Sequence, residues 1–410
     1  HNHIKDRLAG MNSRERVIAA IEHRTPDRVP IDFGATRQTG IMAGAYYQLK
    51  KHLGIGSGET FVFDIYQMMA EIEAPVRERM GSDVVALRSR KVAFGVPNVG
   101  SRPWSLADGT PVTVSEAFEP VVDEKGDLFV TDASGEKIAQ MPAGGLYFDK
   151  LGKSPGAAHV DPDKWGIALI EQEELSHLET QADFWRENSE YAVIGELPAV
   201  ELFYGFGDGW FDDWMVTLMS EQGYVRELYE KALEGMCANF DLFNQAVGGK
   251  IDIAKFNDDF GMQNSEFAPP ELMRELVIPY YKRYIQHIKS RNPKVKIMQH
   301  SCGSIFQILG DMIDAGVEAI NPVQTSAANM EPERLKETYG KKVCFWGGGV
   351  ENQRILQFGT AEDVARQARE RLDIFSPGGG FVFTAIHNIQ HGTPPENVVA
   401  AFDTAREYRY

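Results

Sequence analysis

Cysteine is scarce in this chain, since only Cys237, Cys302 and Cys344 occur among 410 residues. Three thiols cannot all pair within one chain, so a disulfide framework is excluded as the main source of stability. Apolar runs are short too, and none approaches the ~18 residues that a membrane-spanning helix needs. Basic residues are outnumbered by acidic ones, 42 against 59, which gives a net charge of −17.

These shortages exclude several classes of protein. Nucleic acids and anionic membranes attract basic surfaces, so neither is expected as a main partner. The few cysteines fit a reducing, cytoplasmic setting. A hydrophobic share of 43% and a charged share of 25% are typical of a folded globular protein and argue against extensive disorder.

The length permits one large domain. Average domain sizes would divide 410 residues into two or three units, but an α/β barrel can use this much chain in one. Residues 1–10 (HNHIKDRLAG) precede Met11 and are expected to be the remnant of an expression tag. We therefore expect a single domain over residues 11–410.

Eight β-rich apolar runs punctuate the chain, at 29–33, 83–87, 191–196, 251–259, 294–300, 317–323, 342–348 and 381–387. Several are continuously apolar, as in parallel strands that are buried on both faces. Helical patterns separate the later runs. Strand and helix in alternation predict a (β/α)₈ TIM barrel, with a doubly wound sheet as the main rival.

Local signals refine this fold prediction. Pro269, Pro270 and Glu271 open a helical pattern that runs to about Ser290. Capping boxes are expected where Thr360 precedes Asp363 and where Thr393 precedes Glu396. Residues 100–150 are rich in β formers, glycine and Asp-Gly turns, which predicts antiparallel hairpins inserted after the second strand.

Polar residues gather where the predicted strands end. A barrel of this kind places its active site at the carboxyl ends of the strands. The residues that stand there are Asp32, Arg37, Gln38, Glu196, Glu201, Asn257, Asp258, Asp259, His300, Cys302, Asn321, Gln324, Trp346, His387, Asn388 and Gln390. Strand ends are often polar for other reasons, so this clustering alone does not identify a site.

His300 and Cys302 form the sharpest local signal. Imidazole and thiolate both bind zinc, and two residues so spaced can turn toward one metal as a strand ends. His387, at the end of another strand, is the natural third ligand, and three protein ligands leave the open position of a catalytic zinc. The competing interpretation is a small core cysteine beside a hydrogen-bonded histidine.

Two further features have equally plain structural interpretations. Asp258 and Asp259 suit a general acid or a carboxylate that orients a metal ligand, or simply a turn at a strand end. An aromatic stretch from Phe203 to Trp214 suits a pocket for a flat substrate, although packing beneath a loop explains such stretches more often.

Three segments resemble the uroporphyrinogen decarboxylase superfamily: residues 11–34 (MNSRERVIAAIEHRTPDRVPIDFG), 300–324 (HSCGSIFQILGDMIDAGVEAINPVQ) and 381–398 (FVFTAIHNIQHGTPPENV). The resemblance spans essentially residues 11–410 and implies a (β/α)₈ barrel. True decarboxylases of this superfamily carry an RQAGR-like motif whose two arginines hold substrate carboxylates. Here the corresponding stretch, 37–41, ends in Ile41, which argues against a highly anionic tetrapyrrole substrate.

The other branch of the superfamily contains corrinoid-linked methyltransferases. They bind zinc through His-x-Cys and a distant cysteine, to which His300, Cys302 and His387 correspond here. Histidine in place of cysteine keeps a zinc ligand and removes a negative charge, which leaves a stronger Lewis acid. This difference favours polarising an ether oxygen over activating a thiol. The chain is most similar to the methyltransferase components of O-demethylase systems.

The resemblance thus implies methyl transfer from a methoxylated aromatic donor to the corrinoid of a partner protein, because this chain lacks the D-x-H-x-x-G corrinoid signature. Catalytic roles are expected for Asp258, Asp259 and Glu196. Substrate contacts are expected from Arg37, Gln38, Asn321, Gln324, Trp346 and Asn388. The alternatives are a decarboxylase of a small or tetrapyrrole acid and a non-catalytic barrel that binds a tetrapyrrole or a corrinoid. The sequence also permits an oligomer.

Overall fold

The computed structural model describes residues 10–56, 58–151, 160–206 and 211–410, so most of the expected tag and Trp210 lie outside the described residues. Its centre is a parallel sheet of seven strands, in the spatial order β15-β14-β13-β12-β11-β10-β3. These strands are β3 (Val84–Ala86), β10 (Ala192–Glu196), β11 (Ile253–Asn257), β12 (Lys296–His300), β13 (Ala319–Asn321), β14 (Cys344–Trp346) and β15 (Phe381–Val382). Each lies within one of the predicted runs.

The remaining predicted strand, at 29–33, closes the sheet into a barrel. It is reduced to a bridge at Ile31. Ile31 pairs in parallel with Phe383, next to β15. On the other side, the Asp83 N–H donates to the Ile31 carbonyl at 2.7 Å, beside β3. Because Ile31 reaches both edge strands, the predicted (β/α)₈ barrel is confirmed.

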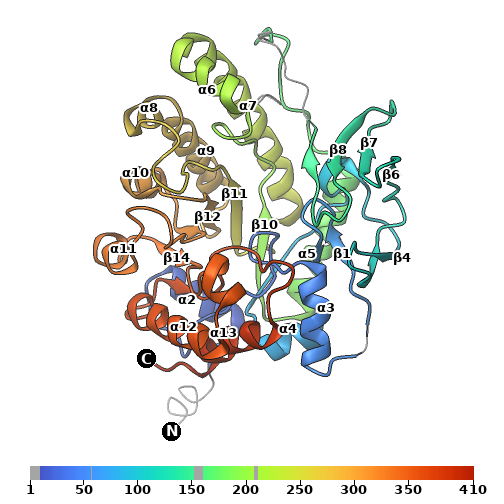
Figure 1. Ribbon diagram of the computed structural model, residues 1–410. Coiled ribbons are helices and arrows are strands. Elements are labelled where there is room, and N and C mark those ends of the chain that lie inside the picture. Colours follow the sequence, from blue (N-terminus) through green and yellow to red (C-terminus); the bar gives the residue numbers. More distant parts are fainter. Residues whose placement is uncertain (1–9, 57, 152–159, 207–210) are drawn as a thin grey trace.

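Helices cover the outside of the barrel (Figure 1). They are α3 (Ala43–His52), α4 (Ala74–Met80), α5 (Gln172–Asn188), α6 (Phe211–Ser220), α7 (Gln222–Val247), α8 (Pro270–Leu276), α9 (Ile278–Arg291), α10 (Phe306–Ala315), α11 (Pro332–Tyr339), α12 (Ala361–Phe375) and α13 (Pro395–Glu407). The short α2 (Ser13–Ile21) is different, because Val17 and Ala20 join the inward-facing residues of the strands in one apolar cluster. None of the helices in the described ranges is long and apolar enough to cross a membrane.

Two of the three predicted helix starts are confirmed. The pattern from Pro269 to Ser290 is helical as α8 and α9, and Thr360 forms its capping box with Asp363. The second capping box is wrong. Pro394 occupies the N-cap position of α13, and the Thr393 hydroxyl instead donates to Gln357 and to the Gln390 carbonyl.

The β-rich insertion follows the second barrel strand, as expected. It contains a pair, β4 (Arg102–Ser105) with β5 (Pro111–Val114), and an antiparallel sheet of β6 (Val121–Val122), β7 (Leu128–Thr131), β8 (Lys137–Met141) and β9 (Asp149–Lys150). A further hairpin, β1 (Val62–Asp64) with β2 (Met69–Ala70), was not predicted. The inserted strands lie beside the barrel, at the right of Figure 1.

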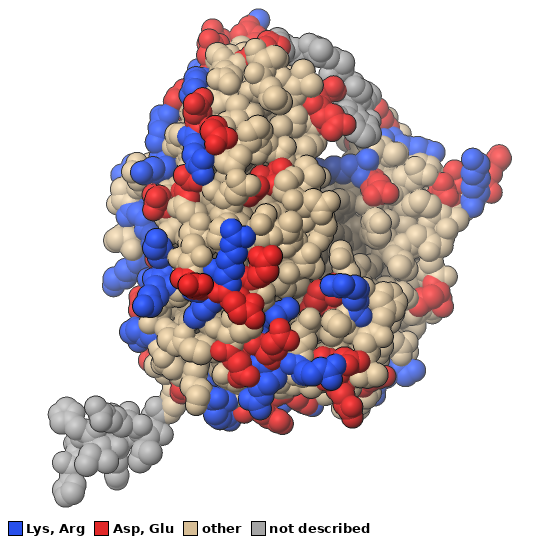
Figure 2. Space-filling model, turned by 60° about the vertical axis from the view of Figure 1, so that its left-hand side comes forward, with Lys and Arg blue, Asp and Glu red and all other residues tan. Residues whose placement is uncertain are grey.

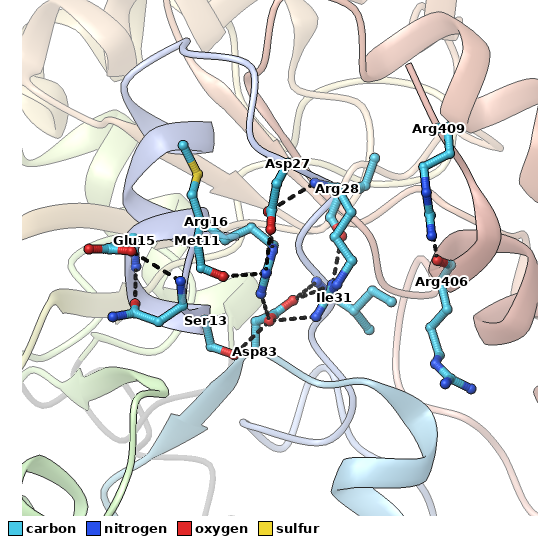
Figure 3. Close-up of polar contacts among 12 residues, drawn as sticks. Met11, Ser13, Glu15, Arg16, Asp27, Arg28, Ile31, Asp83, Arg406 and Arg409 are labelled. Carbon is cyan, nitrogen blue, oxygen red and sulfur yellow. Dashed lines mark hydrogen bonds and ion pairs between the residues drawn. The ribbon is translucent and has the colours of Figure 1, made fainter. Parts of the chain in front are cut away.

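A buried ion cluster holds the amino-terminal end of the barrel together (Figure 3). Asp83, which is fully buried, accepts hydrogen bonds from Arg16 at 2.7 Å and from Arg28 at 2.7 Å. It also accepts from the Ser13 hydroxyl and the Ile31 N–H. One carboxylate therefore ties α2 to the first two strands.

Candidate metal centre

Three donor side chains meet at the carboxyl end of the barrel. His300 is the last residue of β12, Cys302 follows two residues later, and His387 follows β15. One ligand atom from each lies within 4.8 Å of the other two. The Cys302 Sγ atom is 3.4 Å from His300 Nε2. The structure therefore brings together all three residues that the sequence nominated as metal ligands.

A neighbouring amide orients His300. Its Nδ1 atom lies 2.7 Å from Asn321 Oδ1, at the end of the adjacent strand β13. Asn321 is fixed in turn, because its amide nitrogen donates to the Trp346 carbonyl at 2.9 Å. An acceptor on Nδ1 holds the proton there and leaves Nε2 free as the metal-binding nitrogen. Nε2 is also the nitrogen that faces Cys302.

His387 has a comparable support. Its Nδ1 atom lies 3.0 Å from the side-chain oxygen of Asn388. The Asn388 amide donates to Gln67 Oε1 at 2.6 Å, and the His387 N–H donates to Asn352 at 3.1 Å. Both histidines thus use one ring nitrogen for an amide oxygen and keep the other for a ligand, an arrangement common at metal sites.

Burial sets the protonation of the three donors. Burial lowers the pKa of His300, and Lys255 lowers it further, so the imidazole is neutral. Burial also lowers the pKa of His387. Burial raises the pKa of Cys302, and the Asp259 carboxylate adds to the rise, so the sulfur is a thiol until a cation displaces its proton.

The donor chemistry fits a borderline-soft metal ion. Two imidazoles and one thiol suit zinc, whereas magnesium and calcium prefer oxygen ligands. Three protein ligands leave a coordination position for a substrate atom. Cys344 is buried among the inward-facing residues of the barrel, as expected for a core cysteine, and Cys237 is partly buried on α7.

The sequence analysis missed a buried lysine beside the three donors. Lys255, inside β11, is fully buried, and its ammonium donates to Glu196 and to Asn257, both at 2.7 Å. Asn257 Oδ1 also accepts from the Gln38 amide at 3.3 Å, while Gln38 Oε1 is buried without a hydrogen-bond partner among the described residues. The signal was a lysine within the apolar run IDIAKF, two residues before Asn257 and so on the same strand face.

The two adjacent aspartates have different surroundings. Asp258 is fully buried and accepts from the Phe203 and Tyr204 N–H groups and from the Tyr281 hydroxyl. Its carboxylate therefore holds the chain around residue 203. Asp259 faces the donors, because its Oδ1 accepts the Cys302 N–H at 2.7 Å and lies 3.9 Å from His300 Nε2.

The other expected site residues differ in exposure. Gln324 accepts the Gly303 N–H at 2.8 Å and so fixes the turn after Cys302. Trp346 is fully buried, and its indole N–H donates to Asp32 at 2.9 Å. Arg37 is more exposed, and it lies 3.4 Å from Asp64 and over the Tyr66 ring. The aromatic stretch after β10 packs together, with Phe203 against Phe211 and Phe260.

Glu201 is a second titratable group near the donors. Burial raises the pKa of its carboxyl to about 6, and the charge of Asp259 acts in the same direction. Lys150, Arg37 and Lys255 oppose this rise. Burial raises the pKa of Asp32 to about 6 as well, but Asp32 is fully buried, whereas Glu201 is partly exposed and is therefore suited to exchange a proton with a bound molecule near neutral pH.

Comparison with known proteins places this site in a family. The family model described as "Uroporphyrinogen decarboxylase (URO-D)" matches residues 202–408, just over half of the chain. The chain belongs to the uroporphyrinogen decarboxylase family. The matched part begins after β10 and includes His300, Cys302 and His387.

Curated relatives named uroporphyrinogen decarboxylase are distant. The chain is 29% identical to that of Acidiphilium cryptum over 34% of its own length and 36% of the relative's. It is 34% identical to that of Azoarcus over 19% of its length and 21% of the relative's. It is 24% identical to the chloroplastic protein of Oryza sativa over 84% of its length and 80% of the relative's. The chain thus spans about a third of the length of the first of these relatives and about a fifth of the length of the second.

A solved structure matches the whole fold. The methyltransferase from Methanosarcina mazei aligns with a TM-score of 0.61 over 97% of this chain and 99% of its own. The two sequences are 17% identical, so this match confirms the architecture and leaves the activity to be argued from the site.

Proposed function

We propose that this family member is a methyltransferase that moves a methyl group from a methoxylated aromatic compound to the corrinoid of a partner protein. The observation that carries this proposal is the convergence of His300, Cys302 and His387. Decarboxylation of a tetrapyrrole needs no such set of donors, whereas cleavage of an aryl ether needs a cation at the leaving oxygen. The full-length fold match to a methyltransferase supports the same branch.

The reaction is a displacement at the methyl carbon. The methyl group would pass from the ether oxygen to a cobalt(I) corrinoid that the partner supplies, and the electron pair of the broken carbon–oxygen bond would remain on the oxygen as a phenolate. Zinc held by His300, Cys302 and His387 would supply positive charge that stabilises this oxygen. The chain needs no nucleophile of its own, because the cobalt supplies the electron pair.

The surrounding side chains would position the reactants and handle the proton. Asp259 holds the Cys302 backbone, and Asn321 and Asn388 orient the two imidazoles. Glu201, with a pKa of about 6, is the proposed donor of the proton that neutralises the phenolate. Arg37 and Gln38 are the proposed contacts for the substituents of the aromatic ring. Glu196 is proposed to hold Lys255 in place through their ion pair.

Decarboxylation is the second candidate, because the curated relatives are named uroporphyrinogen decarboxylase. The structure weakens it at the carboxylate clamp. Ile41, where the resemblance implies a second arginine, is fully buried and pairs with Ile389. A guanidinium at this position would be desolvated in the core, so no second arginine is available here for a highly anionic substrate.

The test combines metal content with turnover. The purified chain is given zinc, 2-methoxyphenol and cob(I)alamin, and formation of methylcobalamin and catechol is followed. We expect zinc near one equivalent and methyl transfer in the wild type, and loss of both in a His300→Ala, Cys302→Ala double variant. Cys237→Ala, a cysteine substitution on α7 outside the donor set, should retain both. Turnover by the metal-free wild type, or release of carbon dioxide from uroporphyrinogen, would contradict the proposal.

A further inference from the structure

A cavity that is partly open to solvent lies between the start of α3 and the inserted strands. This cavity has a volume of about 280 Å³. Its walls come from Met42 and Gly44 at the start of α3, the turn after β4, and the segment after β8. Figure 1 shows these elements side by side, with α3 facing the inserted sheets. The insertion thus supplies one wall of a cavity whose opposite wall is the start of α3.

The lining is apolar and uncharged. It is built by Met42, Met68, Trp104, Leu106, Phe118, Leu128, Met141, Leu146 and Phe148, with small residues between them. Trp104, Phe118 and Phe148 meet edge to face, with ring centroids 5.5 Å and 5.9 Å apart. No Lys, Arg, Asp or Glu side chain lines the cavity among the described residues. Aromatic edges and thioether sulfurs favour an aromatic ring and disfavour an ion.

Two side chains of this wall are polar, those of Ser105 and His391. The His391 ring lines the cavity, and its Nε2 atom lies 3.3 Å from Asp108 Oδ2. The ring packs so closely on Gly44 that a Cβ atom there would lie 2.1 Å from His391 Nδ1. Asp108 thus lies at ion-pair distance from Nε2, and no hydrogen bond within the described part of the chain engages either ring nitrogen of His391.

The cavity and the metal centre are separate sites on one loop. None of His300, Cys302 and His387 lines the cavity, while His391 follows His387 by four residues. Within that loop Asn388 supports His387, whereas the His391 N–H donates to Met42 Sδ in the cavity wall. The same loop therefore presents one histidine to each site.

We propose that this cavity binds a small uncharged aromatic molecule of one or two rings that carries a hydroxyl group. Its volume exceeds the ~150 Å³ that holds a single benzene ring in an engineered cavity. The apolar wall takes the rings, and the hydroxyl donates to a ring nitrogen of His391. This inference does not depend on methyl transfer, because it uses no residue of the metal centre.

Binding of 2-naphthol to the full chain, followed by isothermal titration calorimetry, tests the proposal. We expect saturable binding with one site. The charged analogue 2-naphthoate should not bind, because the wall offers no cation. Ala143→Phe places a ring at an exposed position of the wall and should weaken 2-naphthol binding about tenfold or more. Ala133→Phe, at an exposed alanine of the same insertion outside the wall, should leave it unchanged.

Two further measurements separate this cavity from the metal centre and isolate the hydroxyl. Cys302→Ala should bind 2-naphthol as the wild type does. His391→Phe should weaken 2-naphthol by about three- to tenfold and leave 2-methoxynaphthalene unaffected, because only the former donates a hydrogen bond. The proposal is overturned if 2-naphthol does not bind, if Ala143→Phe has no effect, or if Cys302→Ala abolishes binding.

Discussion

At the scale of single residues, the candidate metal centre depends on amide side chains as much as on its donors. An imidazole can rotate, and it has two chemically similar nitrogens. Asn321 removes this freedom at His300, because its oxygen accepts from Nδ1 while its nitrogen is held by the Trp346 carbonyl. The partners of metal-binding histidines therefore matter for affinity even though they touch no metal.

Asn321→Ala tests this role of the amide. It should lower zinc affinity by about 10- to 100-fold without loss of the fold, because the donors remain but His300 is no longer oriented. Asn321→Asp keeps the acceptor and should bind zinc more tightly than the alanine variant. Zinc affinity is measured by competition with a chromophoric chelator. Asn188→Ala, at the exposed end of α5, is the control, and equal affinities in both alanine variants would refute the role.

Residue types and spacing were enough to nominate the three donors, but not to assign the roles of the residues around them. His300, Cys302 and His387 could be predicted because each follows an apolar run. Asp258 and Asp259 are adjacent, and only the closed barrel shows that the first holds the chain near Phe203 while the second faces Cys302. Lys255 was missed because a lysine in a strand is ordinarily exposed, and its burial follows from contacts made by distant strands.

At the scale of the elements, long apolar strands were predictable and their ends were not. Ile31 lies in a run as apolar as the others, yet it forms only a single bridge. It pairs with Phe383 on one side and accepts one hydrogen bond from the Asp83 N–H on the other. Thr393 has the sequence of a capping box, but Gln357, from another element, competes for its hydroxyl. Tertiary contacts decided both cases, and sequence spacing does not report them.

The ion cluster fastens α2 to the amino-terminal end of the barrel, and a substitution of Asp83 tests its contribution to stability. Asp83→Asn removes the charge that two arginines share, which leaves Arg16 buried with one partner fewer. We expect the free energy of unfolding to fall by about 3–5 kcal/mol. Urea unfolding followed by circular dichroism measures it.

An ion pair between α4 and α13 provides the control for this prediction. Arg79 and Asp403 are both about one-third exposed and lie 2.6 Å apart. Asp403→Asn should cost no more than about 1 kcal/mol, because solvent screens the pair. If the two variants lose the same free energy of unfolding, the buried cluster at Asp83 contributes no more to stability than an exposed ion pair.

At the scale of the whole molecule, most of the excess negative charge is spread over the surface. Figure 2 shows acidic and basic side chains interspersed on one face, where solvent weakens their interactions. The pH dependence of stability therefore depends on the few buried acids. Glu201 is one of them: burial raises the pKa of its carboxyl from 4.5 to about 6, as it raises that of Asp32 from 3.8 to about 6.

The sign of this effect follows from linkage. Between pH 4.5 and 6, folded Glu201 keeps a proton that the unfolded chain has lost, so its contribution to stability falls as pH rises. Glu201→Gln is neutral at every pH. Its stability relative to the wild type should therefore increase by about 1–2 kcal/mol between pH 4 and pH 7.

Urea unfolding of both proteins at four pH values across this range measures the difference. Glu119→Gln, an exposed acid of the insertion, should show a constant difference from the wild type. A constant difference for Glu201→Gln as well would mean that its carboxyl is ionised in the folded protein at pH 5, and Glu201 would then be unsuited to hold the proton that the proposed reaction requires.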